Sequence, residues 1–292
     1  MSPDIRLLKK HLLRDATSWR CGGPCALYCE AGSLDELRRA LNTAQREGLE
    51  VKVLGGGTNV LASDEGVRAM VIKLAGEFEQ LRVGPSTVCA GAAASLDRFI
   101  SVCCENGRGG LERCAGIPGT VGGAVAGNAG VPNCWTGDFV KSLTVCDDKG
   151  EIRTLSAEEC GFGYRHSDLT GIVLRGTFEL GRGEPCELLS DAREAKARRR
   201  KIPCGNTAGS VFKNPDRAPA GKLLEDAGMK GASEGGARYS TQHANFIVND
   251  GGTASDIRRL MLLGQKAVHE KFGVELEPEV RLWGFDGDGG EL

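Results

Sequence analysis

The chain has 292 residues, of which 40% are hydrophobic and 26% are charged, and its formal net charge at pH 7 is −2. This composition is typical of a soluble globular protein and argues against a collagen-like or disordered chain. The near-neutral charge argues against a nucleic-acid-binding protein held by a general basic field, and no apolar run approaches the ~18 residues of a membrane span.

The chain carries twelve cysteines, and its charged amino terminus, MSPDIRLLKKHLLRD, has no visible signal peptide. We therefore expect a cytoplasmic protein with free thiols, most of them small core residues. No C-x-x-C pair occurs and no histidine stands at zinc-finger spacing, so we predict no metal site.

The predicted elements alternate between helix and strand. In chain order they are a helix capped by Ser33 and ended by Gly48, strands over 51–54 and 69–74, a helix capped by Ser95 and ended by Gly107, strands over 142–146, 152–155 and 171–180, a charged helix over 188–201, a helix from Ser255 to Phe272, and a closing strand over 274–282. In the closing strand, Pro278 indicates an edge or a bulge. The mixture predicts an α+β or α/β protein, with a linker at 181–185 and a domain boundary near 181–187.

Two glycine-rich segments are the first candidates for a binding site. The run Gly55-Gly56-Gly57-Thr58-Asn59 follows a predicted strand, where positive φ angles would turn successive peptide N–H groups into a nest for a pyrophosphate. Its spacing is not the G-x-G-x-x-G of the dinucleotide fold, and a flexible β-turn is the alternative. The segment AGIPGTVGG, from Ala115 to Gly123, predicts close approach to a ligand. Two such loops suggest one extended, phosphate-bearing cofactor.

A third candidate is the serine of AGSVFKNP, Ser210, which follows Gly209 in a predicted tight turn. It does not fit the G-x-S-x-G nucleophile elbow, because Phe212 stands where the second glycine belongs. The basic run 198–201 just upstream is either a solvated helix face or a surface that receives a polyanionic substrate.

Seven motifs in order give the chain a resemblance over almost its whole length: LGGGTNVLASD, GLERCAGIPGTVGGAVAGNAG, FGYRHSDL, AGSVFKNP, AGKLLEDAGMKG, YSTQHANFIVN and LEPEVRLWG. The chain resembles the UDP-N-acetylenolpyruvoylglucosamine reductase family, in its shorter subtype, since the region after Arg165 has no room for an inserted tyrosine-bearing loop. The resemblance implies an α+β protein. Its FAD-binding domain, of the p-cresol-methylhydroxylase/vanillyl-alcohol-oxidase type, covers 1–182 in two subdomains (1–75 and 76–182), and a carboxy-terminal α+β substrate-binding domain covers 183–292.

The resemblance also implies non-covalently bound FAD, with NADPH as the reductant. The residues that it assigns to the cofactor are Gly55, Gly56, Gly57, Thr58, Asn59, Gly116, Ile117, Pro118, Gly119, Thr120, Gly122, Gly123 and Ala124. It implies that flavin N5 gives a hydride to C3 of UDP-N-acetylglucosamine enolpyruvate, and that protonation of C2 then yields UDP-N-acetylmuramate, a precursor of peptidoglycan.

Three residues match the catalytic positions of the family: Ser210 as the proton donor, and Arg165 and Glu279 around the substrate carboxylate. Hydride addition sends negative charge toward C2 and the carboxylate, so the reaction needs an acid over C2 and groups that stabilise an enolate. The arginine fork suits a carboxylate. Glu279 must be either protonated or paired with a cation to help.

Substrate contacts are implied, by the same matching, at Asn214 and more weakly at Tyr164, Lys213, His243 and Asn245. Lys213 has two interpretations, as support for a transient serine alkoxide or as a substrate contact. The segment 131–138 departs from the pattern of many relatives, so its shape and the role of Cys134 beside the flavin stay open.

Two other classes of protein share part of this pattern. A flavin oxidase that passes electrons to oxygen would keep the glycine loops but does not need Ser210, Arg165 and Glu279, and a nucleotide-binding module without catalysis would tolerate their loss. The presence of all three favours the reductase. We expect a monomer that acts on a small molecule and binds neither nucleic acid nor membrane.

Overall fold

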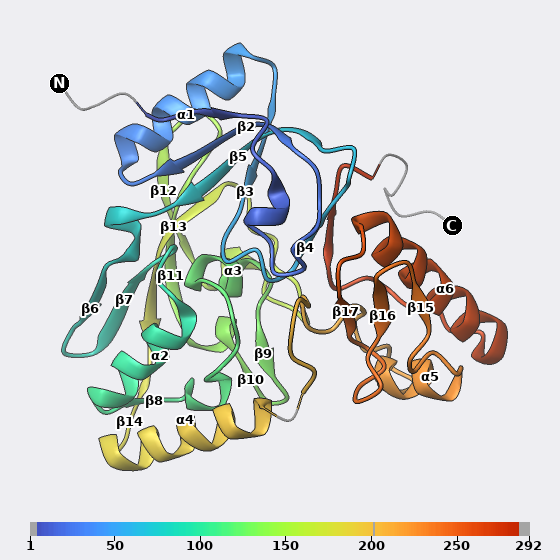
Figure 1. Ribbon diagram of the computed structural model, residues 1–292. Coiled ribbons are helices and arrows are strands. Elements are labelled where there is room, and N and C mark those ends of the chain that lie inside the picture. Colours follow the sequence, from blue (N-terminus) through green and yellow to red (C-terminus); the bar gives the residue numbers. More distant parts are fainter. Residues whose placement is uncertain (1–4, 201, 286–292) are drawn as a thin grey trace. The chain divides into compact units, whose positions relative to one another are not determined.

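The computed structural model describes residues 5–200 and 202–285 (Figure 1). The chain divides into two compact units. Unit 1 contains Met1–Leu8, Leu27–Gly56 and Ala69–Arg199, and unit 2 contains Lys9–Ala26, Gly57–Arg68 and Arg200–Leu292. The predicted mixture of helices and strands is therefore realised in two units that each draw on separate stretches of the chain.

The described residues contain both helices and strands. The α-helices are α1 (Leu34–Arg46), α2 (Leu96–Glu105), α3 (Val121–Ala126), α4 (Pro185–Arg199), α5 (Ala220–Asp226) and α6 (Ala254–Phe272). Short 3₁₀ helices span Leu13–Asp15, Gly76–Glu79, Glu112–Cys114, Thr136–Phe139 and Glu158–Cys160.

The strands of the described residues form six sheets. A four-stranded sheet has the order β1 (Leu8–Lys9), β2 (Cys25–Ala31), β5 (Val67–Leu74), β3 (Glu50–Val53), and a five-stranded sheet has the order β12 (Ile152–Ser156), β11 (Val140–Cys146), β13 (Ile172–Glu179), β7 (Thr87–Gly91), β6 (Leu81–Val83). A three-stranded sheet joins β15 (Ser233–Glu234), β16 (Ala237–Tyr239) and β17 (Ile247–Asn249). Two-stranded sheets pair β9 (Gly130–Val131) with β10 (Cys134–Trp135), β8 (Arg108–Gly109) with β14 (Gly181–Arg182), and β4 (Val60–Ala62) with β18 (Arg281–Trp283).

Local capping explains where the three long predicted helices begin. Ser33 and Ser95 each accept a hydrogen bond from a peptide N–H of the first turn, so these predicted caps are confirmed. The last helix begins one residue earlier than predicted, because Thr253 and Asp256 form a reciprocal capping box and Ser255 lies inside the first turn. The carboxylate of Asp64 supports this turn by accepting hydrogen bonds from the N–H groups of Ala254 and Ser255.

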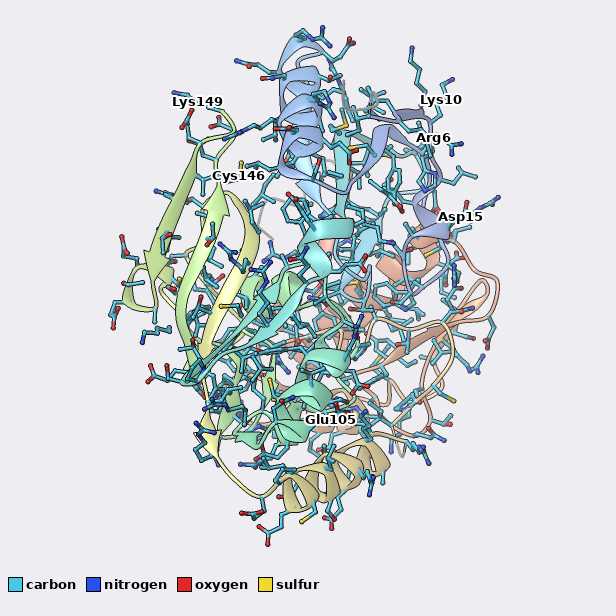
Figure 2. The ribbon with its side chains drawn as sticks, turned by 90° about the vertical axis from the view of Figure 1, so that its left-hand side faces the viewer. Arg6, Lys10, Asp15, Glu105, Cys146 and Lys149 are labelled. Carbon is cyan, nitrogen blue, oxygen red and sulfur yellow. The ribbon has the colours of Figure 1, made fainter. Side chains whose placement is uncertain are left out.

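The core of unit 1 lies between its sheets and helices. Phe99 of α2 packs on Phe178 of β13, with ring centroids 4.7 Å apart, and Figure 1 shows α2 beside α4. The turn after β11 contacts α1 through Arg38, whose Nε donates to the carbonyl of Gly150 over 3.0 Å. Figure 2 shows Cys146 at the end of β11 and Lys149 in this turn.

In unit 2 the helix α6 covers the three-stranded sheet (Figure 1). The buried Tyr239 of β16 donates its hydroxyl hydrogen bond to the carbonyl of Leu260, over 3.0 Å. A Cβ at Gly264 would lie 2.2 Å from the Tyr239 hydroxyl oxygen. Glycine is therefore required at that turn of α6, and its helix-weakening effect is offset by the close packing.

Two predicted segments differ from the structure. The closing strand over 274–282 is reduced to β18, which begins at Arg281, because Pro278 has no N–H to donate to a ladder and makes an isolated bridge to Phe212. The predicted linker 181–185 lies in unit 1, where Gly181 and Arg182 form β14 and Pro185 begins α4. The charged helix over 188–201 is α4, and Lys201 lies outside the described residues.

Nine of the twelve cysteines are buried, which confirms the prediction that most of them are core residues, and all twelve are free thiols. Within residues 5–200 and 202–285, no helix combines the length and the apolar character needed to cross a membrane.

Candidate functional site

The two glycine-rich segments meet in unit 1. A Cβ added to Gly55 would lie 2.7 Å from Oγ1 of Thr120, at the start of α3. Only a residue without a side chain allows this approach. The two loops that the sequence assigned to one ligand are therefore neighbours, although 64 positions separate Gly55 from Gly119.

The second segment is shaped by its own hydrogen bonds. The N–H groups of Val121 and Gly122 donate to the carbonyls of Ala94 and Ala92, each over 2.9 Å, and Thr120 Oγ1 caps α3 by accepting from the N–H of Gly123. A Cβ at Gly122 would lie 2.8 Å from that of Ala92. These glycines provide close backbone packing and leave a surface without side chains.

The first segment differs in one respect from the expectation, because the positive φ predicted for the glycine run occurs at Gly57 alone, at +64°. The Nδ2 of Asn59 donates to the carbonyl of Glu279 over 3.0 Å, and its own carbonyl accepts from the N–H of Arg281. The Asn59 side chain therefore supports Glu279, and its contact with the cofactor stays a prediction.

These residues fit a flavin dinucleotide. The side-chain-free faces of Gly55 and the Thr120–Gly123 turn let a planar or phosphate-bearing group approach the main chain closely, where Thr120 supplies a hydroxyl group. Gly116 has a φ of +81°. A Cβ built at Gly116 would lie 3.1 Å from Cδ of Arg199, so this arginine places a positive charge at the edge of the second loop.

Ser210 and Glu279 are brought together in unit 2 through Val211. The N–H of Val211 donates to the carbonyl of Asn245 over 2.9 Å, and the N–H of Glu279 donates to the carbonyl of Val211 over 2.8 Å. Ser210 also forms an antiparallel bridge with Phe246. The segment that contains Ser210 therefore lies between the segments that contain Asn245 and Glu279. The φ of +82° at Gly209 forms the turn that leads into Ser210.

The other predicted contacts of AGSVFKNP are anchored nearby. Lys213 Nζ lies 2.5 Å from Oε1 of Glu277, and the N–H of Lys213 donates to the Glu277 carbonyl. Asn214 is exposed, and its Oδ1 accepts from the N–H of Ala220 at the start of α5. Glu277 therefore fixes the position of the ammonium group two residues from Glu279.

His243 and Asn245 have different surroundings. The imidazole of His243 accepts the N–H of Asn245 at Nδ1 and packs on Phe246 and Gly221; this desolvation lowers the pKa of His243, although the residue as a whole is exposed. The buried side chain of Asn245 bonds both the N–H and the carbonyl of Phe212, at 3.0 and 2.8 Å. Asn245 therefore supports the Ser210 loop, and its contact with the substrate stays a prediction.

Arg165 lies in unit 1, between aromatic side chains. Its guanidinium carbon is 5.3 Å from the ring centroid of Trp135 and 5.9 Å from that of Tyr164, and Nη1 donates to the carbonyl of Gly130 over 3.2 Å. The backbone of Arg165 has a φ of +53°, which is strained for a residue with a side chain.

The sequence left the shape of the segment 131–138 open. A tight hairpin pairs Val131 with Cys134 and Gly130 with Trp135, and the 3₁₀ helix Thr136–Phe139 follows it. Trp135 was not among the predicted site residues. Its position between the second glycine segment and GYRHSDL was the only signal for it in the sequence.

The fold and the glycine loops define a class of protein, and a family model described as "FAD binding domain" matches residues 25–156. A second model, for the C-terminal domain of UDP-N-acetylenolpyruvoylglucosamine reductase, matches residues 200–283. The chain is an FAD-binding oxidoreductase of α+β fold. The two matches leave 157–199 unassigned, so the predicted domain boundary at 182/183 stays a prediction.

The relatives then identify the family. The UDP-N-acetylenolpyruvoylglucosamine reductase of Rubrobacter xylanophilus is 41% identical over 93% of both chains, and that of Moorella thermoacetica is 40% identical over 96% of this chain and 94% of the relative. The crystal structure of the Thermus caldophilus reductase superposes with a TM-score of 0.84 at 36% identity, covering 96% of this chain and 99% of the other. This chain belongs to the UDP-N-acetylenolpyruvoylglucosamine reductase family, as its seven motifs indicated.

Proposed function

We propose that this protein reduces UDP-N-acetylglucosamine enolpyruvate to UDP-N-acetylmuramate, with NADPH as the reductant, in the synthesis of peptidoglycan precursors. Family membership supports the substrate, and the placement of Ser210 beside Glu279 carries the proposal. An oxidase or a passive nucleotide-binding protein has no use for an acid and a carboxylate held on adjacent segments.

FAD bound at the Gly55 and Thr120 loops supplies a hydride once it has been reduced. Hydride addition to C3 of the enolpyruvyl group moves negative charge onto C2 and the neighbouring carboxylate. The guanidinium of Arg165 binds this carboxylate and stabilises the charge. Its contact with Trp135 limits its motion, so the fork is oriented before the reaction begins.

Ser210 acts as the acid and gives its hydroxyl proton to C2. A serine is a weak acid in water, but a carbanion held against it is a far stronger base than its alkoxide. The ammonium of Lys213 supports the alkoxide, which recovers a proton from water. Glu279, in its protonated or cation-paired form, adds a hydrogen bond to the developing charge. Asn214, Tyr164 and His243 contact the substrate.

The half-reactions test this proposal against the oxidase alternative. Purified protein should show a yellow FAD spectrum that NADPH bleaches without oxygen, and the enolpyruvyl substrate should restore the oxidised spectrum. Substrate-independent reoxidation by air at catalytic speed would instead identify an oxidase. A spectrum that stays bleached after the substrate is added would overturn the proposal.

We also propose that the protein works in the cytoplasm as a monomer, since the substrate is a water-soluble nucleotide-activated sugar. Light scattering of the FAD-loaded protein at micromolar concentration checks the second point, because a dimer would double the measured mass.

A further inference from the structure

Two thiols of unit 1 lie in direct contact. Sγ of Cys114 is 3.4 Å from Sγ of Cys134, and both residues are buried. The Cys134 thiol also lies 3.2 Å from the carbonyl of Gly110, and the Cys114 thiol 3.4 Å from the carbonyl of Cys134. A disulfide has an S–S distance of about 2.05 Å, so the two sulfurs need to approach by about 1.4 Å to bond.

The two thiols differ chemically. The hydrogen bond from Cys134 lowers the pKa of Cys114, and the positive charges of Arg199 and Arg113 lower it further. The same interaction raises the pKa of Cys134. Cys114 is therefore the more easily ionised of the two, and in a contacting pair such a thiol attacks an oxidant while its partner resolves the product.

We propose that Cys114 and Cys134 form an oxidisable dithiol that a hydroperoxide, such as hydrogen peroxide, converts into a disulfide. Cys114 gives up its proton and its sulfur attacks one peroxide oxygen, the O–O bond breaks, and the departing hydroxide takes that proton and leaves as water. The Cys134 sulfur then attacks the Cys114 sulfenic sulfur, the S–O bond breaks, and a second water leaves. Two thiols lose two electrons, and one peroxide is reduced to two waters.

The disulfide has a consequence for Arg165. Cys134 and Trp135 are consecutive residues of β10, which pairs with Gly130 and Val131 of β9. Trp135 lies under the Arg165 guanidinium, and the Gly130 carbonyl accepts its hydrogen bond. Closing the disulfide draws the hairpin toward Cys114 and moves both supports of Arg165. Oxidation should therefore lower the turnover that we propose for this protein by on the order of 10- to 100-fold, because displacements near 1 Å have such effects.

Other cysteines provide internal controls. Cys103 and Cys104 are adjacent and buried, and burial raises the pKa of their thiols to about 12 and about 11, so they should stay reduced. Cys186 and Cys204 are exposed, and their replacement by serine removes the thiols that peroxide reaches directly. This double variant is the background for the experiment.

The experiment exposes the folded Cys186→Ser/Cys204→Ser protein to stoichiometric hydrogen peroxide, alkylates the remaining thiols in denaturant and maps the peptides by mass spectrometry. We expect a loss of two thiols, one Cys114–Cys134 cross-linked peptide, and reversal by dithiothreitol. The added changes Cys114→Ser and Cys134→Ser should each abolish the cross-link. Peptides that retain both thiols, or a Cys114 oxidised only to sulfinic acid, would overturn the proposal.

Mapping the wild-type chain gives the same answer if a serine variant fails to fold. The effect on turnover rests on the proposed function, whereas the peptide map does not. Cross-linked protein that keeps full reductase activity would overturn the link to Arg165. Untreated protein without reductase activity would count against the proposed function and leave the dithiol standing.

Discussion

The proposed catalytic groups of the two units are held in different ways. In unit 2 the main chain positions Ser210 and Glu279, because the N–H of Glu279 donates to the carbonyl of Val211 over 2.8 Å and the N–H of Lys213 donates to the carbonyl of Glu277 over 2.9 Å. In unit 1 the side chain of Arg165 is positioned by its neighbours, with Trp135 5.3 Å from the guanidinium. Backbone ladders keep their form when side chains change, so the serine and the glutamate should tolerate nearby substitutions better than the arginine does.

Within unit 1, the most severe loss should follow removal of the arginine. We expect Arg165→Met to lower kcat/KM by about 10²–10³, as the loss of a preorganised charge at a developing anion does. Arg165→Lys keeps the charge but not the planar fork, and should recover only part of the rate. Single-turnover reoxidation of the reduced flavin measures this step. A methionine variant within threefold of wild type would remove Arg165 from the reaction.

The stability of unit 2 should depend on a side chain, that of Asn245, as well as on its main chain. The Asn245 side chain bonds both polar groups of the buried Phe212 backbone, so Asn245→Ala leaves them unsatisfied and should cost about 1–3 kcal/mol of unfolding free energy. Asn206→Ala, which removes an exposed amide with one 3.2 Å bond, is the matched control and should cost less. Equal losses in urea unfolding would contradict the role given to Asn245.

A smaller effect should follow when the aromatic support of Arg165 is removed. Cation–π contacts contribute about 0.5–2 kcal/mol, so Trp135→Leu should slow reoxidation by about tenfold and leave FAD binding unchanged. Trp135→Phe retains an aromatic face, so its rate of reoxidation should lie between that of the wild type and that of the leucine variant. If the leucine variant reacts at the wild-type rate, the contact with Trp135 does not position Arg165.

The smallest expected effect is on the pH dependence of stability, and it comes from buried thiols, which both units contain. Burial raises the pKa of Cys21 in unit 2 and of Cys103 in unit 1 to about 12, from an ordinary value of 9.0. Below pH 9 both thiols are protonated in the folded and the unfolded chain, and their contribution to stability is complete. Above pH 9 the unfolded chain loses these protons first, so stability falls as pH rises toward 12.

The raised pKa of each thiol should therefore lower the free energy of unfolding by about 1 kcal/mol between pH 9 and pH 10. Cys103→Ala should reduce the slope of unfolding free energy against pH by that amount, and Cys21→Ala should do the same. A slope unchanged in both variants would show that these thiols titrate normally in the folded protein.

Local signals in the sequence were enough for the capped helices, because a serine followed by a helical apolar stripe specifies a first turn without tertiary help. The helix α3 and the strand β2 are among the elements that escaped this reasoning. The helix α3 contains VGGAVA, whose glycines disfavour a helix in isolation, and it forms because its turn packs on Ala92 and Ala94. The strand β2 carries no clean alternation, since five of its seven residues are buried.

The site was harder to predict than the helices, because its members meet only after folding. The neighbourhood of Ser210 and Glu279, which are 69 positions apart, came from the resemblance and not from periodicity or spacing. The contact of Cys114 with Cys134 depends on the hairpin over 130–135, and no local pattern indicates it. The hydrogen bond from Asn59 to the Glu279 carbonyl is likewise visible only in the folded chain, because an asparagine in a glycine loop predicts a ligand contact.

The central claim is that Ser210 is the acid of the second half-reaction, and Ser210→Ala tests it most directly. Stopped-flow spectra, recorded without oxygen, follow the reduction of FAD by NADPH and then its reoxidation by the enolpyruvyl substrate. We predict reduction within about twofold of wild type and reoxidation slowed by about 10²–10⁴, the range for loss of a general acid. Reoxidation at the wild-type rate would contradict the assignment of Ser210 as the proton donor.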